Sequence, residues 1–172
     1  MQKLTVLIPT FNEAENLQEL LPIVSWADEV MVVDSYSTDD TVNIAKSFSA
    51  KVIQREYINS ANQKNWAIPQ AENEWIFLID ADERPNAELI AEVKNILSNE
   101  TDNNKPIAYW IYRDNFFLGK HIRYSGWQND RVIRFFKGDK CRYEEKAVHA
   151  EIVTDGKVGW MKGRFLHYTY KN

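Results

Sequence analysis

The sequence has very little cysteine and no long apolar run. Cys141 is the only cysteine in 172 residues, which excludes an intramolecular disulfide, a Cys-x-x-Cys redox pair and a cysteine-based zinc site. No stretch approaches the roughly 18 apolar residues that a membrane-spanning helix needs. The apolar run near the N-terminus is too short for a signal peptide, and acidic residues follow it closely. We therefore expect a cytoplasmic protein in a reducing compartment.

Glycine is also scarce, and it is unevenly placed. All six glycines lie beyond residue 118, at positions 119, 126, 138, 156, 159 and 163. This placement excludes a glycine-rich dinucleotide turn or a Walker phosphate loop in the first half of the chain. A nucleotide that binds there must be held in another way.

The charges are sorted along the chain. Residues 1–104 hold 7 basic and 18 acidic residues, a net charge of −11, whereas residues 105–172 hold 14 basic and 7 acidic residues, a net charge of +7. A basic half attracts anionic partners, so it suits an anionic acceptor or peripheral association with a membrane. Two ordinary solvated faces explain the pattern equally well. We expect no nucleic-acid partner.

Short apolar runs alternate with amphipathic stretches over the first hundred residues, a pattern typical of βα units around a mostly parallel sheet. The apolar runs predict strands over residues 4–8, 30–33, 51–54 and 75–79. The 3–4 spacing of apolar residues predicts helices over 12–24, 42–48 and 61–71, and a further helix from Pro85 to about Leu97.

From residue 106 onward the pattern changes to β-branched and aromatic runs separated by turns. Strands are predicted over residues 107–112, 131–136, 148–153 and 165–170. This half is therefore expected to be mainly β, with antiparallel character, and its boundary with the first half lies near residue 105.

Two aspartates one residue apart follow the most hydrophobic strand. Asp80 and Asp82 are expected at the carboxyl end of a parallel strand, where open α/β sheets bind ligands. Their carboxylates could share Mg²⁺ or Mn²⁺, completed by waters and phosphates. Such a cation stabilises the negative charge of a departing diphosphate. Aspartates are also common in turns and helix caps, so this pair alone is weak support for a metal site.

Polar residues end two more of the predicted strands. Asp34 follows the second strand, where an acidic residue commonly accepts hydrogen bonds from a ribose. The segment Pro9-Thr10-Phe11-Asn12-Glu13 ends the first strand with side chains suited to a nucleobase edge. Each segment could instead cap the following helix. Three polar strand ends at successive positions nevertheless favour a nucleotide site.

Four segments, VLIPTFNE, VVDSYSTDDT, ANQKNWAI and FLIDADERP, resemble in order and spacing the motifs of the inverting family 2 glycosyltransferases. Further on, WQNDRVIRFF, YEEKAVHAEI, DGKVG and FLHYTY are similar to small bacterial transferases that add a hexose to the lipopolysaccharide inner core. The resemblance implies an α/β fold of the GT-A (Rossmann-like) type, with a mostly parallel sheet and helices on both faces. Residues 1–105 would form the nucleotide-sugar-binding half, and residues 106–172 a β-rich acceptor-side half of the same domain.

The resemblance also implies an activity. A hexose, with glucose favoured, would pass from a UDP-sugar to a hydroxyl of a glycolipid or saccharide acceptor, with lipopolysaccharide core as the first candidate. The reaction would use Mg²⁺ or Mn²⁺ and would take place in the cytoplasm, at the inner face of the membrane. Similar transferases continue past the FLHYTY segment, so this chain resembles a C-terminally truncated form. A non-catalytic nucleotide-sugar-binding module and a nucleotidyltransferase are the alternatives.

Site residues follow from the resemblance position by position. Those implied to contact the nucleotide or donor sugar are Pro9, Thr10, Asn12, Glu13, Asp34, Lys64, Asp80 and Ala81. Asp82 and Asp80 would hold the metal, and a histidine could complete its shell, with His149 favoured over His167. A histidine between apolar residues is, however, more often structural.

An inverting displacement needs one base, which removes the proton of the acceptor hydroxyl. The pair Glu144-Glu145 resembles the Glu-Asp pair of the family, and Glu145 is favoured as the base over Glu144, with Asp130 and Glu151 as further candidates. Both glutamates of the pair could instead be surface charges. Several relatives have His-Glu where this chain has His149-Ala150, so a role for a glutamate at that position is in doubt.

The second half holds 14 of the 22 aromatic residues, most of which are expected in the core. Trp127, next to Gly126, is the residue that we expect to form a platform for a sugar ring. Arg131 and Arg134 are candidates for binding donor or acceptor phosphates through bidentate hydrogen bonds. Solvated charges at a strand edge are an equally good reading of these two arginines.

Overall fold

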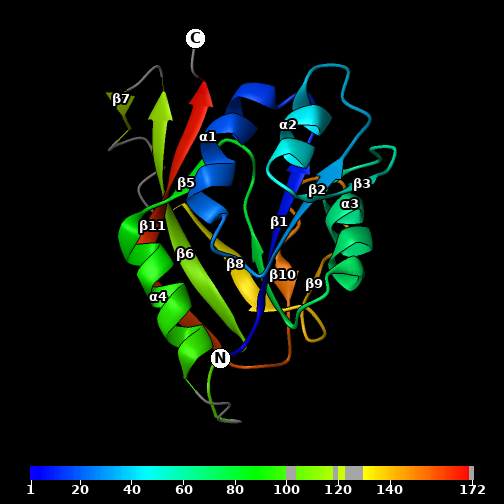
Figure 1. The fold of residues 1–172 in the computed structure, drawn as a ribbon. Coiled ribbons are helices and arrows are strands. Elements are labelled where there is room, and N and C mark those ends of the chain that lie inside the picture. The colour runs from blue at the N-terminus through cyan, green and yellow to red at the C-terminus, as the bar shows by residue number, and fades with distance from the viewer. Residues whose placement is uncertain (100–103, 118–119, 123–129, 171–172) are drawn as a thin grey trace.

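The computed structural model describes residues 1–99, 104–117, 120–122 and 130–170, and its centre is one large sheet (Figure 1). The strands of this sheet are β1 (Leu4–Thr10), β2 (Glu29–Asp34), β3 (Lys51–Gln54), β4 (Trp75–Leu78), β5 (Glu83–Pro85), β6 (Ala108–Phe117), β7 (Lys120–His121), β8 (Arg131–Lys137) and β11 (Val158–Tyr170). Their order is β3-β2-β1-β4-β8-β6-β11-β5, and β7 pairs with β6. Two short strands, β9 (Arg142–Tyr143) and β10 (Ile152–Val153), form a separate antiparallel pair.

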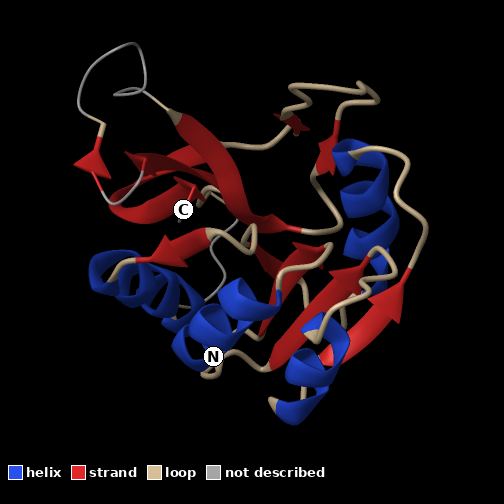
Figure 2. Cartoon of the chain, turned by 90° about the horizontal axis from the view of Figure 1, so that it is seen from above, coloured by secondary structure: helices blue, strands red, loops and turns tan. Residues whose placement is uncertain are grey.

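Helices cover both faces of the sheet, which is curled when seen from above (Figure 2). They are α1 (Ala14–Val24), α2 (Thr41–Ser47), α3 (Ser60–Ala67), the 3-10 helix η1 (Ile68–Gln70) and α4 (Ala87–Ser98). One hydrophobic cluster joins the sheet to α1, α2 and α4, and a second joins its other face to α3, η1 and the β9-β10 pair. None of the helices in the described ranges is long and apolar enough to cross a membrane.

The central strands are apolar throughout because both of their faces are covered. In β4, Trp75 and Phe77 belong to the cluster beneath α1 and α4, whereas Ile76 and Leu78 belong to the cluster beneath α3. All four side chains are buried. This alternation places the end of β4 between the two helical layers, and after the buried Ile79 the chain emerges at the edge of the sheet with Asp80.

The parallel strands β1, β2, β3 and β4 bring their carboxyl ends to one edge of the sheet. The chain order reverses at β1, which pairs with β2 on one side and with β4 on the other. Such a reversal is where open α/β sheets bind ligands. Because Thr10 pairs with Asp34 in the β1–β2 register, the polar ends of these two strands lie side by side.

The second half continues the same sheet, and its strands are not all antiparallel. β8 runs antiparallel to β4 and β6, as expected, but β11 runs parallel to β6. The strand predicted over residues 148–153 is reduced to Ile152–Val153. The positive φ of His149, 52°, explains this difference, because a non-glycine residue in that region interrupts an extended strand.

Pro85 does not open a helix, contrary to the prediction. It ends β5 and pairs with Phe165 of β11. α4 begins at Ala87, where the side chain of Asn86 accepts a hydrogen bond from the backbone N–H of Leu89 at 2.9 Å. The asparagine cap, rather than the proline, therefore sets the start of this helix.

α4 packs very closely against β11 at a bulge between Trp160 and Arg164. The carboxylate of Glu92 accepts hydrogen bonds from the backbone N–H groups of Lys162 and Gly163, at 3.0 Å and 2.8 Å. A Cβ atom on Gly163 would lie 2.2 Å from the backbone nitrogen of Leu89. Only a residue without a side chain fits between this strand and the helix.

We predict that Gly163→Ala lowers the free energy of unfolding by about 3 kcal/mol, because the helix backbone would have to move to admit the methyl group. Urea titration followed by circular dichroism measures the change. Lys162→Ala, at the exposed neighbouring position, is the control and should have little effect. Equal stability of Gly163→Ala and the unaltered protein would contradict the close packing described here.

Candidate functional site

The ends of β1 and β2 form a rigid polar corner around Asp34. This side chain is fully buried, and its carboxylate accepts hydrogen bonds from Thr10 Oγ1 at 3.2 Å, from Ser37 N at 3.0 Å and from Gln54 Nε2 at 3.0 Å. Asp34 therefore does not cap α2, whose N-cap residue is Asp40. Its role in the protein alone is to hold the loop after β2 in place.

The loop after β1 is tied to the same corner. Asn12 has a positive φ of 54°, and its side-chain oxygen accepts a hydrogen bond from Thr38 N at 2.8 Å. Its backbone N–H donates to Ser37 Oγ at 2.8 Å. Asn12 thus joins two strand ends and is not the cap of α1, whose N-cap position is Glu13. Burial raises the pKa of Glu13, and the charge of Asp82 acts in the same direction, against a hydrogen bond from Asn16.

Asp80 emerges at the end of β4 between two cations. Lys64 Nζ of α3 lies 3.2 Å from Asp80 Oδ1, and Arg134 of β8 forms an ion pair with Asp80 Oδ2. Burial alone would raise the pKa of Asp80, but the charges of Arg134 and Lys64 outweigh it and hold the pKa well below its ordinary value. Asp80 is therefore ionised, and both of its oxygens are engaged.

A second layer of buried charge lies behind Asp80. The backbone N–H of Asp80 donates to Glu83 Oε2 at 3.0 Å, and Glu83 is fully buried. Arg113 of β6 lies 3.3 Å from Glu83 and donates two hydrogen bonds to the carboxylate of Asp130, of 2.9 Å and 2.7 Å. Burial tends to raise the pKa of Asp130, but the bidentate contact with Arg113 dominates and lowers it.

Asp82 faces a histidine from β11. His167 Nε2 lies 3.2 Å from Asp82 Oδ2, and His167 Nδ1 lies 2.6 Å from Asn115 Oδ1. The pairing of β11 with both β5 and β6 produces this arrangement, because it sets His167 opposite Glu83 and opposite Asn115. Burial lowers the pKa of His167, but the neighbouring Asp82 carboxylate outweighs this effect and raises it.

The Asp82–His167 pair fits a divalent cation. Two ligands at right angles on an octahedral ion with bonds of about 2.1 Å lie about 3 Å apart, close to the observed separation. A hydrogen bond from Nδ1–H to Asn115 would leave the Nε2 lone pair free for the ion. The described residues contain no group of three or more His, Cys, Asp or Glu side chains that could hold a metal ion. Phosphate and water oxygens would therefore have to complete the shell.

A cavity of about 420 Å³ opens beside Asp80. Its walls come from the start of α3, from β6 and β8, and from the segment 143–152. Five cations and three acids of the described chain line it. The acids are Asp80, Asp130 and Glu151, of which Asp80 and Asp130 are engaged by arginine.

The two glutamates favoured as the base lie away from this cavity. Glu145 lines a smaller neighbouring hollow, and Glu144 binds Lys146 at 2.9 Å and accepts a hydrogen bond from Glu151 N at 3.2 Å. Glu151, by contrast, lines the cavity, and its carboxylate forms no hydrogen bond or ion pair with another described residue.

The two candidate histidines have different surroundings in the structure. His149 is exposed and lines the cavity near Glu151, whereas His167 is the histidine that contacts Asp82. Trp127 lies outside the described residues, as does Gly126. Arg134 contacts Asp80 and Tyr143, and Arg131 is the first residue of the same strand.

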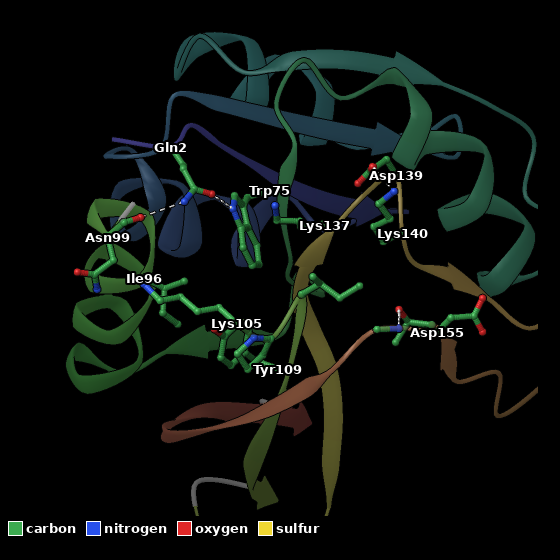
Figure 3. Close-up of a pocket in the computed structure, with 14 residues that line it drawn as sticks. Gln2, Trp75, Ile96, Asn99, Lys105, Tyr109, Lys137, Asp139, Lys140 and Asp155 are labelled. Carbon is green, nitrogen blue, oxygen red and sulfur yellow. Dashed lines mark hydrogen bonds and ion pairs between the residues drawn. The ribbon is translucent and has the colours of Figure 1, made fainter. Parts of the chain in front are cut away.

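A larger cavity, of about 520 Å³, lies at the opposite end of the sheet (Figure 3). There Gln2 hydrogen-bonds to the Trp75 indole and to Asn99, and Lys137 and Lys140 lie near the amino end of β4. Both lysines are paired with acids, Lys137 with Glu74 and Lys140 with Asp139. This cavity is far from the polar strand ends and shares no residue with the cavity at Asp80.

Comparison with known proteins identifies the family. The sequence profile of glycosyl transferase family 2 matches residues 5–153. The chain belongs to this family. An uncharacterized glycosyltransferase of Rickettsia typhi is 38% identical over 98% of this chain, and the lipopolysaccharide core biosynthesis glycosyltransferase LpsC of Rhizobium meliloti is 27% identical over 96%.

The structure of residues 1–349 of Staphylococcus aureus TarS in complex with UDP-GlcNAc matches 99% of this family 2 chain with a TM-score of 0.69, at 18% identity. This likeness confirms the predicted GT-A fold. The chain spans about three fifths of its relatives: 61% of the Rickettsia protein, 63% of LpsC and 59% of the TarS structure.

Sequence reasoning missed several members of this family 2 site. Glu83, Arg113 and Asn115 were not singled out, because Glu83 lies in the polar segment after the fourth predicted strand and the other two lie just beyond the strand predicted over residues 107–112. A charged residue beside a predicted strand is a signal only where it is buried, because burial of a charge requires a partner. Which partner it meets depends on the strand order, and nothing in the sequence gives that directly.

We predict that Asp130→Asn lowers the free energy of unfolding by about 2 kcal/mol at pH 7, because Arg113 loses a charged bidentate partner. Because folding lowers the pKa of Asp130, its contribution is present above the ordinary value of 3.8 and is lost as the pH falls further. Urea titrations at several pH values should therefore show a difference that is constant from pH 7 to 5 and shrinks below pH 4.

The matched control for this charge removal is Asp139→Asn, at an exposed aspartate that pairs with Lys140. It should change stability little at any pH, because surface ion pairs contribute little. A difference for Asp130→Asn that did not depend on pH would contradict the assigned ion pair.

Proposed function

We propose that this protein is an inverting, metal-dependent glycosyltransferase that moves a hexose from a UDP-sugar to an acceptor hydroxyl. The observation that carries the proposal is the contact of 3.2 Å between Asp82 and His167 at the carboxyl end of the sheet, next to the ionised Asp80. An oxygen and a nitrogen ligand at this spacing suit Mn²⁺ or Mg²⁺. Such an ion would stabilise the charge on the leaving diphosphate.

The donor would lie across the strand ends. We assign the nucleotide to the corner formed by Pro9, Thr10, Asn12, Glu13 and Asp34, where buried hydrogen bonds already fix the loops. Lys64 and Asp80, with Ala81 between Asp80 and the metal ligand, would face the diphosphate and donor sugar. The structures of TarS with UDP-GlcNAc and of the Mycobacterium tuberculosis glucosyl-3-phosphoglycerate synthase with Mn²⁺ and UDP support this class of donor and cofactor.

For the base, the geometry favours a different residue from those that the sequence favoured. Glu145 and Glu144 were favoured from the sequence, but neither lines the cavity at Asp80. We propose Glu151, whose carboxylate lines the cavity with no competing partner among the described side chains. Without a cation beside it, this carboxylate is free to accept the proton of an acceptor hydroxyl.

For the acceptor we propose a saccharide of the lipopolysaccharide core, and glucose as the donor sugar. Support comes from the likeness to LpsC, a core biosynthesis glycosyltransferase. The excess of basic residues after position 104 favours an anionic acceptor at the inner membrane face.

The metal assignment is tested by calorimetric titration of UDP-glucose with and without Mn²⁺. We expect metal-dependent binding, and we expect Asp82→Asn and His167→Ala each to weaken it at least about tenfold. His149→Ala is the control that separates the two histidines, and it should bind like the unaltered protein. Metal-independent binding of UDP-glucose by the unaltered protein would contradict the proposal.

The base assignment is tested by transfer assays on three glutamine variants. We expect Glu151→Gln to lower the transfer rate at least about 100-fold while UDP-glucose binding is retained, because only proton removal is lost. Glu144→Gln and Glu145→Gln serve as matched controls and should transfer at nearly normal rates. A fast Glu151→Gln variant would reject this residue as the base, and UDP-glucose binding without measurable transfer by the unaltered protein would favour a binding module over an enzyme.

A further inference from the structure

An aromatic stack lies on the sheet beside the cavity at Asp80. Trp110 of β6 and Trp160 of β11 stack with their ring centroids 5.9 Å apart, and Tyr112 stacks on Trp160 at 5.6 Å. Trp160 is 52% exposed, although tryptophan is usually well covered. Trp160 is therefore the member of the stack that presents an aromatic surface to solvent, of the kind on which sugar rings pack.

Arg131 of β8 lies over this stack. Its guanidinium carbon is 5.5 Å from the ring centroid of Trp110 and 5.5 Å from that of Trp160. Stacking of this kind holds the planar group in place while its N–H edges stay available for hydrogen bonds. Arg131 is exposed, and both Arg131 and Trp110 line the cavity that contains Asp80.

Arg131 differs from the other cations of the cavity in having no acidic partner among the described residues. Lys64 and Arg134 pair with Asp80, Arg113 pairs with Asp130, and Lys146 pairs with Glu144. A guanidinium that is fixed by two indoles but lacks a counter-ion is suited to a bidentate contact with a carboxylate or phosphate.

The position of Arg131 along β8 relates it to the reaction centre. Arg134, which contacts Asp80, is three residues further along the strand, so the two backbone positions lie about 10 Å apart. A register shift between β6 and β8 at Tyr109 and Trp110 allows both arginines to line one cavity. The cavity that both arginines line has a volume of about 420 Å³, within the range of small-molecule sites, and Trp110 of the stack lines it as well.

We propose that Arg131 and the Trp110–Trp160 stack form an acceptor subsite for an anionic saccharide, with the acidic group on Arg131 and a sugar ring against Trp160. This inference rests on the proposed transferase function and deepens it, because it states that the acceptor carries a phosphate or a carboxylate close to the hydroxyl that is glycosylated. Arg131 acts here as a positioning and specificity residue.

The test measures binding of three probes, glucose, glucose 6-phosphate and glucuronic acid, to the protein saturated with UDP and Mn²⁺. The indole N–H signals of Trp110 and Trp160 in nitrogen-15 NMR spectra report the position of each probe. We expect at least one acidic sugar to bind about tenfold more tightly than glucose and to shift these signals. Which acidic sugar binds better distinguishes phosphate from carboxylate as the recognised group.

Three variants isolate the contribution of the guanidinium. Arg131→Gln should reduce acidic-sugar binding to the level of glucose, whereas Arg131→Lys should retain only part of the preference, because an ammonium lacks the planar fork. Lys46→Gln removes one positive charge from an exposed position on α2 and should leave the preference intact.

Several results would overturn the inference. Equal binding of glucose and both acidic sugars, an unchanged preference in Arg131→Gln, or binding of inorganic phosphate as tight as that of glucose 6-phosphate would each do so. If the addition of UDP abolished binding of the acidic sugars, their binding site would be the donor site instead. Failure of UDP itself to bind would contradict the proposed function, whereas the sugar preference would still be measured in the protein without UDP.

Discussion

Charged side chains from separate strands meet in the largely buried region behind the end of β4, and the site depends on their mutual compensation. Asp80 and Glu83 lie in the turn after β4 and in β5, and Arg134 and Arg113 reach them from β8 and β6. A buried carboxylate without a cation would be strongly destabilising. The network therefore attaches the turn that contains Asp82 to the strands of the second half. As a result, the position of this candidate metal ligand depends on the fold.

Much of the fold could be predicted from the sequence, because the spacing of apolar residues and the polar residues that separate the apolar runs carry local information. The third strand was predicted with the bounds observed, Lys51–Gln54, and the apolar runs of β1, β2 and β4 were located correctly. The start of α4 was placed too early, because Pro85 is compatible with both a first helical turn and an edge strand. The parallel pairing of β11 with β6 was not predictable, because strand order arises from packing between segments more than 40 residues apart in the chain.

Strand ends gave the clearest signal for the candidate site, whereas Lys64 was implied by the family resemblance and Arg134 was one of two readings of a strand arginine. Asp34 and Asp80 were singled out because each comes directly after an apolar run, and Asp82 because it is separated from Asp80 by one residue. His149 was favoured over His167 as a metal ligand, because both are single histidines among apolar residues. Only the β5–β11 register distinguishes them. The same limit applies to Glu151, because nothing in the sequence shows that it lines the cavity whereas Glu144 and Glu145 do not. Arg131 and Trp160 lie on two different strands, and their contact could not be predicted because the sequence does not give the order of the strands in the sheet.

The proposed function requires one divalent ion between Asp82 and His167, and anomalous diffraction at the manganese absorption edge tests for this ion most directly. Crystals grown with UDP and Mn²⁺ should give an anomalous peak about 2 to 2.3 Å from both Asp82 Oδ2 and His167 Nε2, with the rest of the ion's shell made of phosphate and water oxygens. A manganese peak elsewhere, or UDP bound at the strand ends with no peak between these two side chains, would contradict the account.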